Sequence, residues 1–197
     1  MGVGKSTQIK LLAEHFKSKG LKVNIAGLKV GNLWAYPLYK IALIGWPIFK
    51  NKYMFKMWVV LDLIAISLKF LISIWLPFKA GRLILVEEYI PAIVADYLHI
   101  ARINGYPPKD VRAIIAYTSR LATLVPFTSV FLDADTAVIR ERWKSRGTSD
   151  EKLEYILVQQ KLLPLITKLL SHRLIYIATS DSSVKETSYY LKEHLIN

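Results

Sequence analysis

The amino-acid sequence predicts an α/β fold in which a mostly parallel sheet is flanked by helices. Short apolar segments alternate with longer segments of helical periodicity, as strands and crossover helices do in such folds. One short segment, residues 83–86, is an unbroken Leu-Ile-Leu-Val run, which is typical of a strand covered on both faces. The 197 residues, of which 53% are hydrophobic and 21% charged, predict a single folded domain over residues 1–197.

The first half of the chain predicts two helices and two strands. Apolar residues recur at helical spacing over residues 8–19, which indicates a helix, and they alternate over 21–28, which indicates a strand. Residues 54–76 predict a long apolar helix that ends at Pro77, because proline lacks a backbone N–H and disturbs a helix. Residues 82–88 follow as a buried strand.

The second half of the chain predicts five helices and two strands. Asp110 and Ser149 are the expected N-caps of two of these helices, and Pro164 is a potential break in the second. The helices are expected at residues 91–104, 110–124, 136–145, 149–170 and 183–195, and the strands at 127–132 and 173–178.

The composition excludes several kinds of site and favours anionic ligands. The chain has no cysteine, which excludes disulfides, thiolate metal sites and a thiol nucleophile. Its formal net charge is +12, so its surface should attract polyanions such as nucleotides. No nucleic-acid-binding module is recognisable, so no nucleic-acid partner is expected. Because no apolar leader follows Met1, we expect a cytoplasmic protein.

The first residues of the sequence form a motif typical of phosphate binding. Glycines let backbone N–H groups close around phosphate oxygens, and a helix that starts directly afterwards adds its positive end. Lys5 would reach the β- and γ-phosphates of ATP, and Ser6 would bind Mg²⁺. The alternative is a glycine-rich segment that arose by chance. The motif residues are Gly2, Val3, Gly4, Lys5, Ser6 and Thr7.

The complete motif also has a glycine four residues before Gly4 and a buried strand before that glycine. The sequence begins at Met1, so this first strand is expected to be missing from the chain. We interpret this as a start codon assigned too late rather than as a truncated form, because the rest of the domain is represented.

Two acidic residues follow the predicted strand at 82–88. Glu87 would hold Mg²⁺ through a water molecule beside Ser6, and a second carboxylate at Glu88 could orient an attacking water, as in ATPases. The alternative is a strand that emerges into solvent with two surface acids.

Arginines gather on the predicted helix at 136–145 and directly after it. Arg142 and Arg146 are four residues apart and share a helix face. Together with Arg140, they could stabilise a phosphoryl group during transfer. A solvated basic face is the alternative interpretation.

These motifs resemble the thymidylate kinase family of P-loop nucleoside-monophosphate kinases. Residues 5–8 (Lys-Ser-Thr-Gln) match the end of that family's phosphate loop, and residues 131–151 resemble its fourth strand, its arginine-bearing lid and the start of the next helix. The resemblance implies a three-layer P-loop NTPase fold, ATP and Mg²⁺, and the reaction of dTMP with ATP to give dTDP and ADP. It implies catalytic roles for Lys5, Arg140, Arg142 and Arg146, with a lid over 137–150. We expect a homodimer.

The acceptor side departs from the family pattern. The family's Asp-Arg-Tyr after the third strand stands here as Glu87-Glu88-Tyr89, which reverses one charge, and its Tyr-Gln pair stands as Asp96-Tyr97. Two alternatives therefore stay open beside a dTMP-type acceptor. One is a P-loop ATPase or nucleotide-dependent binding module, and the other is a kinase for an apolar or lipid-linked phosphate at a membrane surface. The candidate substrate-binding residues are Lys29, Asp62, Glu88 and Tyr97.

Residues 33–80 form an apolar region that the resemblance places beside the acceptor. Within it, residues 57–76 are long enough to span a bilayer, but Asp62 and Lys69 would each cost about 3 kcal/mol near the bilayer centre. With Ser73, these residues form one narrow polar stripe on the helix. Three interpretations stay open: a helix buried in the domain with the stripe facing a polar cleft, an apolar acceptor site or oligomer surface, and contact with a membrane.

Overall fold

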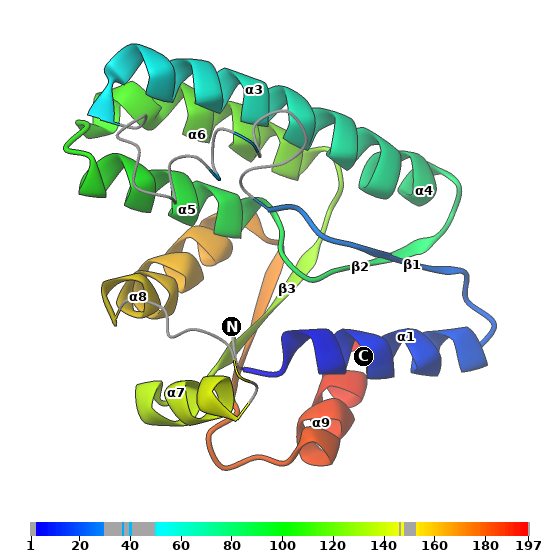
Figure 1. Ribbon diagram of the computed structural model, residues 1–197. Helices are drawn as coiled ribbons and strands as arrows, with labels where there is room; N and C mark the ends of the chain where they lie inside the picture. Colours follow the sequence, from blue (N-terminus) through cyan, green and yellow to red (C-terminus); the bar gives the residue numbers. More distant parts are fainter. Residues whose placement is uncertain are drawn as a thin grey trace.

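The computed structural model describes residues 3–29, 37, 40, 50–145, 147 and 153–196. In this part of the chain, short parallel strands lie between two layers of helices (Figure 1). The helices are α1 (Lys5–Ser18), α3 (Lys52–Phe70), the π-helical turn η2 (Leu71–Trp75), α4 (Leu76–Lys79), α5 (Ile90–Ile103), α6 (Pro108–Thr123), α7 (Thr136–Lys144), α8 (Leu153–Leu170) and α9 (Val184–Ile196). The strands are β1 (Val23–Ala26), β2 (Leu83–Val86), β3 (Thr128–Asp133) and β4 (Arg173–Ala178).

The strands form two parallel pairs, which confirms the predicted α/β class. β1 pairs with β2, and β3 pairs with β4 over its whole length. Within the described residues no hydrogen bonds join β2 to β3, so the expected sheet consists of two separate halves. Because β2 has a strand neighbour on one side only, its four residues are half-buried, whereas the sequence predicted a buried strand.

Alternating side chains of β2 face the two helical layers. Leu83 and Leu85 join a core formed with α1 and α9, whereas Ile84 and Val86 join the core of α3, α5 and α6. Such alternation follows from the two-residue period of a strand. The strands therefore form the middle of three layers.

Helix α1 contacts both strand pairs and brings its first residue to the carboxyl end of the strands. Its buried Leu12 and Phe16 pack with Ile175 and Ile177 of β4, and residues of β1 and β2 pack against the same cluster. Gly20 follows the helix with a φ of 81° and turns the chain towards β1.

The long apolar helix continues through Pro77, so the prediction that it ends there was wrong. The wider π-helical turn η2 precedes the proline, and α4 carries the helix on to Lys79. A proline cannot donate to the carbonyl four residues before it. That carbonyl belongs to Ser73, and it accepts a hydrogen bond of 2.9 Å from the Asn24 side chain of β1 instead.

The inner face of α3 contributes a buried polar pair to an aromatic core. Tyr97 of α5 donates a 2.7 Å hydrogen bond to the Asp62 carboxylate, and both side chains are fully buried. Trp58 packs edge-on against Tyr97 with ring centroids 5.8 Å apart. The expectation that the polar stripe of α3 faces a cleft is therefore wrong at Asp62.

Most other predicted elements are confirmed, with ends that shift by a few residues. α6 begins at Pro108, so Asp110 is its third residue rather than its N-cap, and α8 continues through Pro164. α1 begins at Lys5 rather than at residue 8. Residues 33–36, 38, 39, 41–49 and Ser149 lie outside the described residues.

We expect Tyr97→Phe to lower the free energy of unfolding by about 1–3 kcal/mol, because it removes a donor from a buried carboxylate. Urea denaturation measures this change. Tyr189→Phe is the matched control, because Tyr189 is largely exposed, and it should have little effect. Equal effects of the two substitutions would contradict a stabilising role for the buried pair.

Candidate functional site

The site is built around the first turn of α1. Gly4 precedes the helix with a φ of 89°, a left-handed conformation that glycine adopts without strain. The first turn contains no acidic residue of its own. Val3 is buried against Ile139 and Trp143 of α7, which holds this loop beside α7. Of the predicted loop residues, Thr7 is exposed and Gly2 lies outside the described residues.

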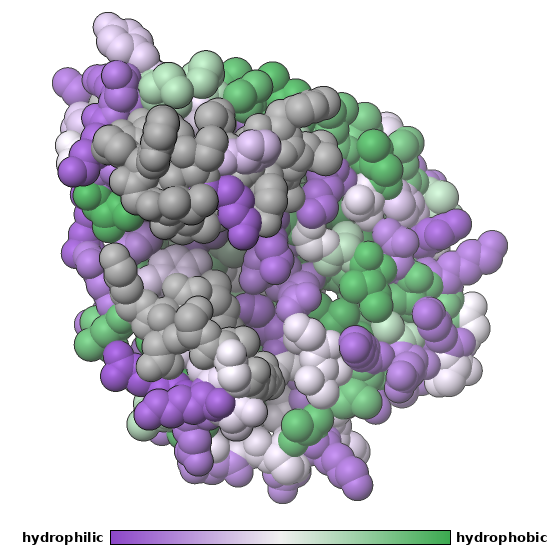
Figure 2. All heavy atoms as spheres, viewed as in Figure 1, coloured by the Kyte–Doolittle hydropathy of each residue, from purple (hydrophilic) through white to green (hydrophobic). Residues whose placement is uncertain are grey.

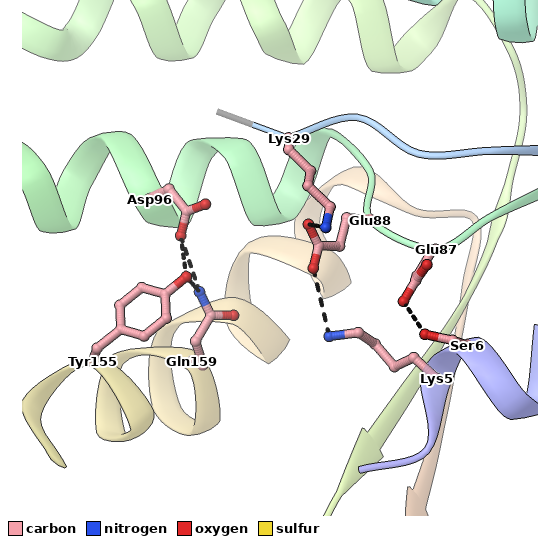
Figure 3. Close-up of polar contacts among 8 residues, drawn as sticks. All are labelled: Lys5, Ser6, Lys29, Glu87, Glu88, Asp96, Tyr155 and Gln159. Atoms are coloured by element: carbon pink, nitrogen blue, oxygen red, sulfur yellow. Dashed lines mark hydrogen bonds and ion pairs between the residues drawn. The ribbon is translucent and has the colours of Figure 1, made fainter. Parts of the chain in front are cut away.

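Two acidic residues lie opposite the first turn of α1 because the backbone pairing of β1 and β2 continues beyond the strands. The Glu87 N–H donates to the Ala26 carbonyl over 3.0 Å, and the Leu28 N–H donates to the Glu88 carbonyl over 2.8 Å. Successive side chains of extended backbone point to opposite sides. Glu87 therefore points to Ser6, and Glu88 points to the lysines (Figure 3).

Glu87 and Ser6 form the first polar contact of the site. The Ser6 hydroxyl donates a hydrogen bond of 2.5 Å to Oε1 of Glu87 (Figure 3). A hydroxyl and a carboxylate oxygen are hard ligands, which suit Mg²⁺, a cation that usually keeps several waters and takes few protein ligands. The donor set thus fits the predicted Mg²⁺ position. Within the described residues no cluster of three or more His, Asp or Glu side chains forms a separate metal site.

Glu88 lies between two lysines. Its Oε1 is 3.8 Å from Nζ of Lys5, and its Oε2 is 3.9 Å from Nζ of Lys29 (Figure 3). Lys5 and Glu88 are each largely shielded from solvent, whereas Lys29 is mostly exposed. Two cations from different segments of the chain therefore offset the Glu88 carboxylate.

A third acidic group, Asp96 of α5, lies near Glu88 and was not among the predicted site residues. Tyr155 donates a 2.9 Å hydrogen bond to its Oδ1, and Gln159 donates to the same oxygen over 3.1 Å (Figure 3). Burial raises the pKa of Asp96 to about 7, and the nearby Glu88 charge adds to this effect, although both hydrogen bonds and Lys5 oppose it. The sequence signal was the spacing of Tyr155 and Gln159, which places both on one face of α8.

The predicted lid arginines have different surroundings. Arg142 donates to the Thr179 carbonyl over 2.8 Å and so ties α7 to the chain after β4. The Nε atom of Arg140 is buried and has no hydrogen-bond partner within the described residues. Arg146 lies outside them, so the convergence of the three arginines stays a prediction.

Hydrogen bonds to the Asp133 side chain join the carboxyl end of β3 to β4 and to α8. Its carboxylate accepts hydrogen bonds from the Tyr176 hydroxyl and from Gln160, the latter over 3.1 Å. The bond to Asp133 raises the pKa of Tyr176 to about 12. This network fixes the end of β3, from which the chain leads into α7. It thereby supports the loop at Val3, which packs against α7.

The structure brings five predicted site residues together and separates two others from them. The first group is Lys5, Ser6, Lys29, Glu87 and Glu88. Asp62 and Tyr97 instead form the buried pair between α3 and α5, with no surface that a substrate could reach. Their predicted role in substrate binding is therefore wrong in this structure, because burial in the core satisfies the polar stripe internally.

We expect the stability of the protein to fall as the pH rises from about 4 to about 7, because folded Asp96 keeps its proton longer than the unfolded group. Asp96→Asn should therefore stabilise the protein more at high pH than at low pH. The gain at about pH 8 should exceed that at about pH 5 by at least about 1 kcal/mol. Urea denaturation at both pH values tests this, and a pH-independent difference would contradict it.

Comparisons with known proteins identify no relative of this chain. No protein family matches the chain, and no curated protein matches it. The arrangement of Lys5, Ser6, Glu87 and Glu88 is therefore interpreted from its own chemistry and from the motif to which it belongs.

Proposed function

We propose that this protein is a P-loop phosphotransferase of the thymidylate kinase type. It transfers the γ-phosphoryl group of ATP to a nucleoside monophosphate, and dTMP is the first candidate acceptor. One observation carries the proposal: Lys5 and Ser6, at the start of α1, lie opposite Glu87 and Glu88, at the end of β2. This pairs a phosphate-binding helix terminus with the carboxylates that a nucleotide-bound Mg²⁺ requires.

The donor nucleotide would bind at the first turn of α1. Backbone N–H groups of that turn and the Lys5 ammonium would hold the β- and γ-phosphates. Lys5 already contacts an anionic oxygen at 3.8 Å, so its side chain reaches into the space between α1 and β2. Ser6 and Glu87 would hold Mg²⁺, which neutralises charge on the phosphates when bound.

The acceptor would approach from the side of Lys29. An oxygen of the acceptor phosphate forms a bond to the γ-phosphorus as the bond to the β-phosphate oxygen breaks, and ADP leaves with that electron pair. Lys29 is the exposed cation beside Glu88 and would attract the acceptor phosphate. No covalent enzyme intermediate is needed, because positioning and charge neutralisation supply most of the catalysis.

Glu88 favours a second candidate function, ATP hydrolysis. Its carboxylate is 3.8 Å from the Lys5 ammonium, and it is therefore close to the place where a γ-phosphate would lie. A carboxylate in that place can orient a water molecule for attack. The same carboxylate would repel an acceptor phosphate unless Lys29 offsets its charge.

The decisive experiment is ATP turnover with Mg²⁺, with product identification, in the presence and absence of dTMP. Formation of dTDP and ADP in equal amounts supports the proposed kinase. Release of inorganic phosphate at a rate that dTMP does not change supports the ATPase. Turnover of neither kind, with dTMP or with other nucleoside monophosphates, would contradict both candidates.

We expect Lys5→Met to reduce ATP turnover by about a hundredfold or more, because it removes the cation that stabilises the phosphates. Lys10→Met is the matched control, because Lys10 is an exposed lysine on the same helix. The affinity for a fluorescent ATP analogue should fall in the first variant only. Equal activity in the two variants would exclude Lys5 from the phosphate site.

We expect Glu88→Gln to separate the two functions. If Glu88 orients water, hydrolysis without an acceptor should fall by about a hundredfold. If the protein is a kinase, dTDP formation should persist, and the KM for dTMP should fall because a repelling charge is lost. Glu14→Gln, on the exposed side of α1, is the control for the change in net charge.

A further inference from the structure

The outer face of α3, η2 and α4 carries an apolar stripe. Its side chains are between 38% and 83% exposed, and apart from the adjacent Leu71 and Ile72 they follow one another every three or four residues along the helix. Hydrophobic side chains cover this edge of the molecule (Figure 2). A helix from residue 53 to residue 76 extends about 36 Å, so the stripe is as long as a small domain is wide. The stripe consists of Tyr53, Met57, Val60, Ile64, Leu68, Leu71, Ile72 and Leu76.

Cations flank this apolar stripe, and the segment that carries it, residues 50–82, has no exposed acid. In residues 50–82 the only acid is Asp62, which is fully buried against Tyr97. Lys79 lies over the Trp75 ring, with Nζ 5.9 Å from the ring centroid. Lysine and tryptophan at the end of an apolar surface are characteristic of the boundary between lipid and water. The exposed cations of this segment are Lys50, Lys52, Lys56, Lys79 and Arg82.

We propose that the apolar stripe docks on the surface of an anionic lipid bilayer, with the helix lying in the plane of the membrane. The exposed apolar side chains would enter the boundary between headgroups and acyl chains. The flanking cations would contact anionic headgroups, and the electrostatic attraction of each would weaken as the salt concentration rises. This inference does not depend on the proposed catalytic function.

The helix lies on the membrane rather than across it. Residues 52–79 are long and apolar enough to cross a bilayer by length and composition. The opposite face of the same helix is part of the protein core, where Phe55, Trp58 and Ile66 are buried with α5 and α6. Crossing would expose the Asp62 carboxylate to lipid and would break its hydrogen bond to Tyr97. In-plane docking leaves that core intact.

The charges also favour a lipid surface over a second copy of the chain. In a two-fold symmetric pair, the same surface faces itself. If two stripes packed antiparallel, Lys52 and Lys56 of one copy would face Lys79 and Arg82 of the other, so like charges would meet at both ends. An anionic bilayer meets the same residues with opposite charge.

Flotation of the full chain with lipid vesicles tests the proposal. The vesicles contain phosphatidylcholine alone or phosphatidylcholine with phosphatidylserine, each at low and at physiological salt. We expect binding to the anionic vesicles, with Ile64→Glu/Ile72→Glu lowering the partition coefficient by about tenfold or more, because both substitutions place charge on the stripe. The matched control is Leu165→Glu/Leu169→Glu, which changes the charge equally at two exposed leucines of α8.

A second pair of variants separates the flanking cations from net charge. Lys56→Gln/Lys79→Gln should weaken binding by about thirtyfold, because each of the two lysines contributes about 1 kcal/mol near an anionic surface. Lys17→Gln/Lys19→Gln removes the same charge from exposed positions at the end of α1 and directly after it, and should have a smaller effect. Circular dichroism and urea denaturation show whether each variant is folded, apart from its binding to vesicles.

Three results would overturn the proposal. The first is no binding of the parent chain to anionic vesicles at low salt. The second is binding that falls equally in the stripe variant and in its α8 control, which would indicate attraction by net charge alone. The third is a dimer in solution that Ile64→Glu/Ile72→Glu dissociates, without vesicle binding by the parent, which would make the stripe an interface between copies.

Discussion

The packing of α1 against the strands is the interaction on which the site depends. Leu12 and Phe16 bury the inner face of the helix against β4, and residues of β1 and β2 join the same cluster. The two strand pairs share no hydrogen bonds within the described residues, so this apolar contact is what holds them to a common helix. Its consequence is chemical: the first turn of α1, with Lys5 and Ser6, faces the acidic end of β2.

Charge compensation shapes that end of the molecule. Glu88 is offset by lysines from α1 and from the segment after β1, and Glu87 accepts a hydrogen bond from Ser6. Asp96 completes a group of three acids, and burial raises its pKa although its two hydrogen bonds act in the opposite direction. A protein with a net charge of +12 thus gathers acids beside the loop that precedes α1. A divalent cation and a polyphosphate bound there would bring charges of both signs.

Helix α3 has its acidic side chain on the inner face and large apolar side chains on the outer face, which is the reverse of the usual arrangement on a surface helix. Its one acid, Asp62, faces inward and accepts a hydrogen bond from Tyr97, while a row of large apolar side chains faces outward. Apolar surface of this extent and regularity on a folded domain marks an interaction surface. Pro77 does not interrupt this row of apolar side chains, because the helix continues through the proline by way of η2. The Ser73 carbonyl, which the proline leaves without its usual donor, accepts from the Asn24 side chain.

The sequence by itself determined the alternation of strands and helices, because hydrophobic periodicity is a local property. It also determined that Gly4, Lys5 and Ser6 lie together before a helix and that two acids directly follow β2, since these residues are contiguous in the chain. Only the tertiary structure decided the partners of these side chains. It showed that Glu88 lies between Lys5 and Lys29. It also showed that Asp96 accepts from Tyr155 and that Arg142 binds Thr179. It also decided which face of α3 is buried, so Asp62 is a core residue and not a substrate ligand. Those outcomes depend on the packing of elements far apart in the chain, and a helical wheel does not specify which side of a helix its neighbours cover.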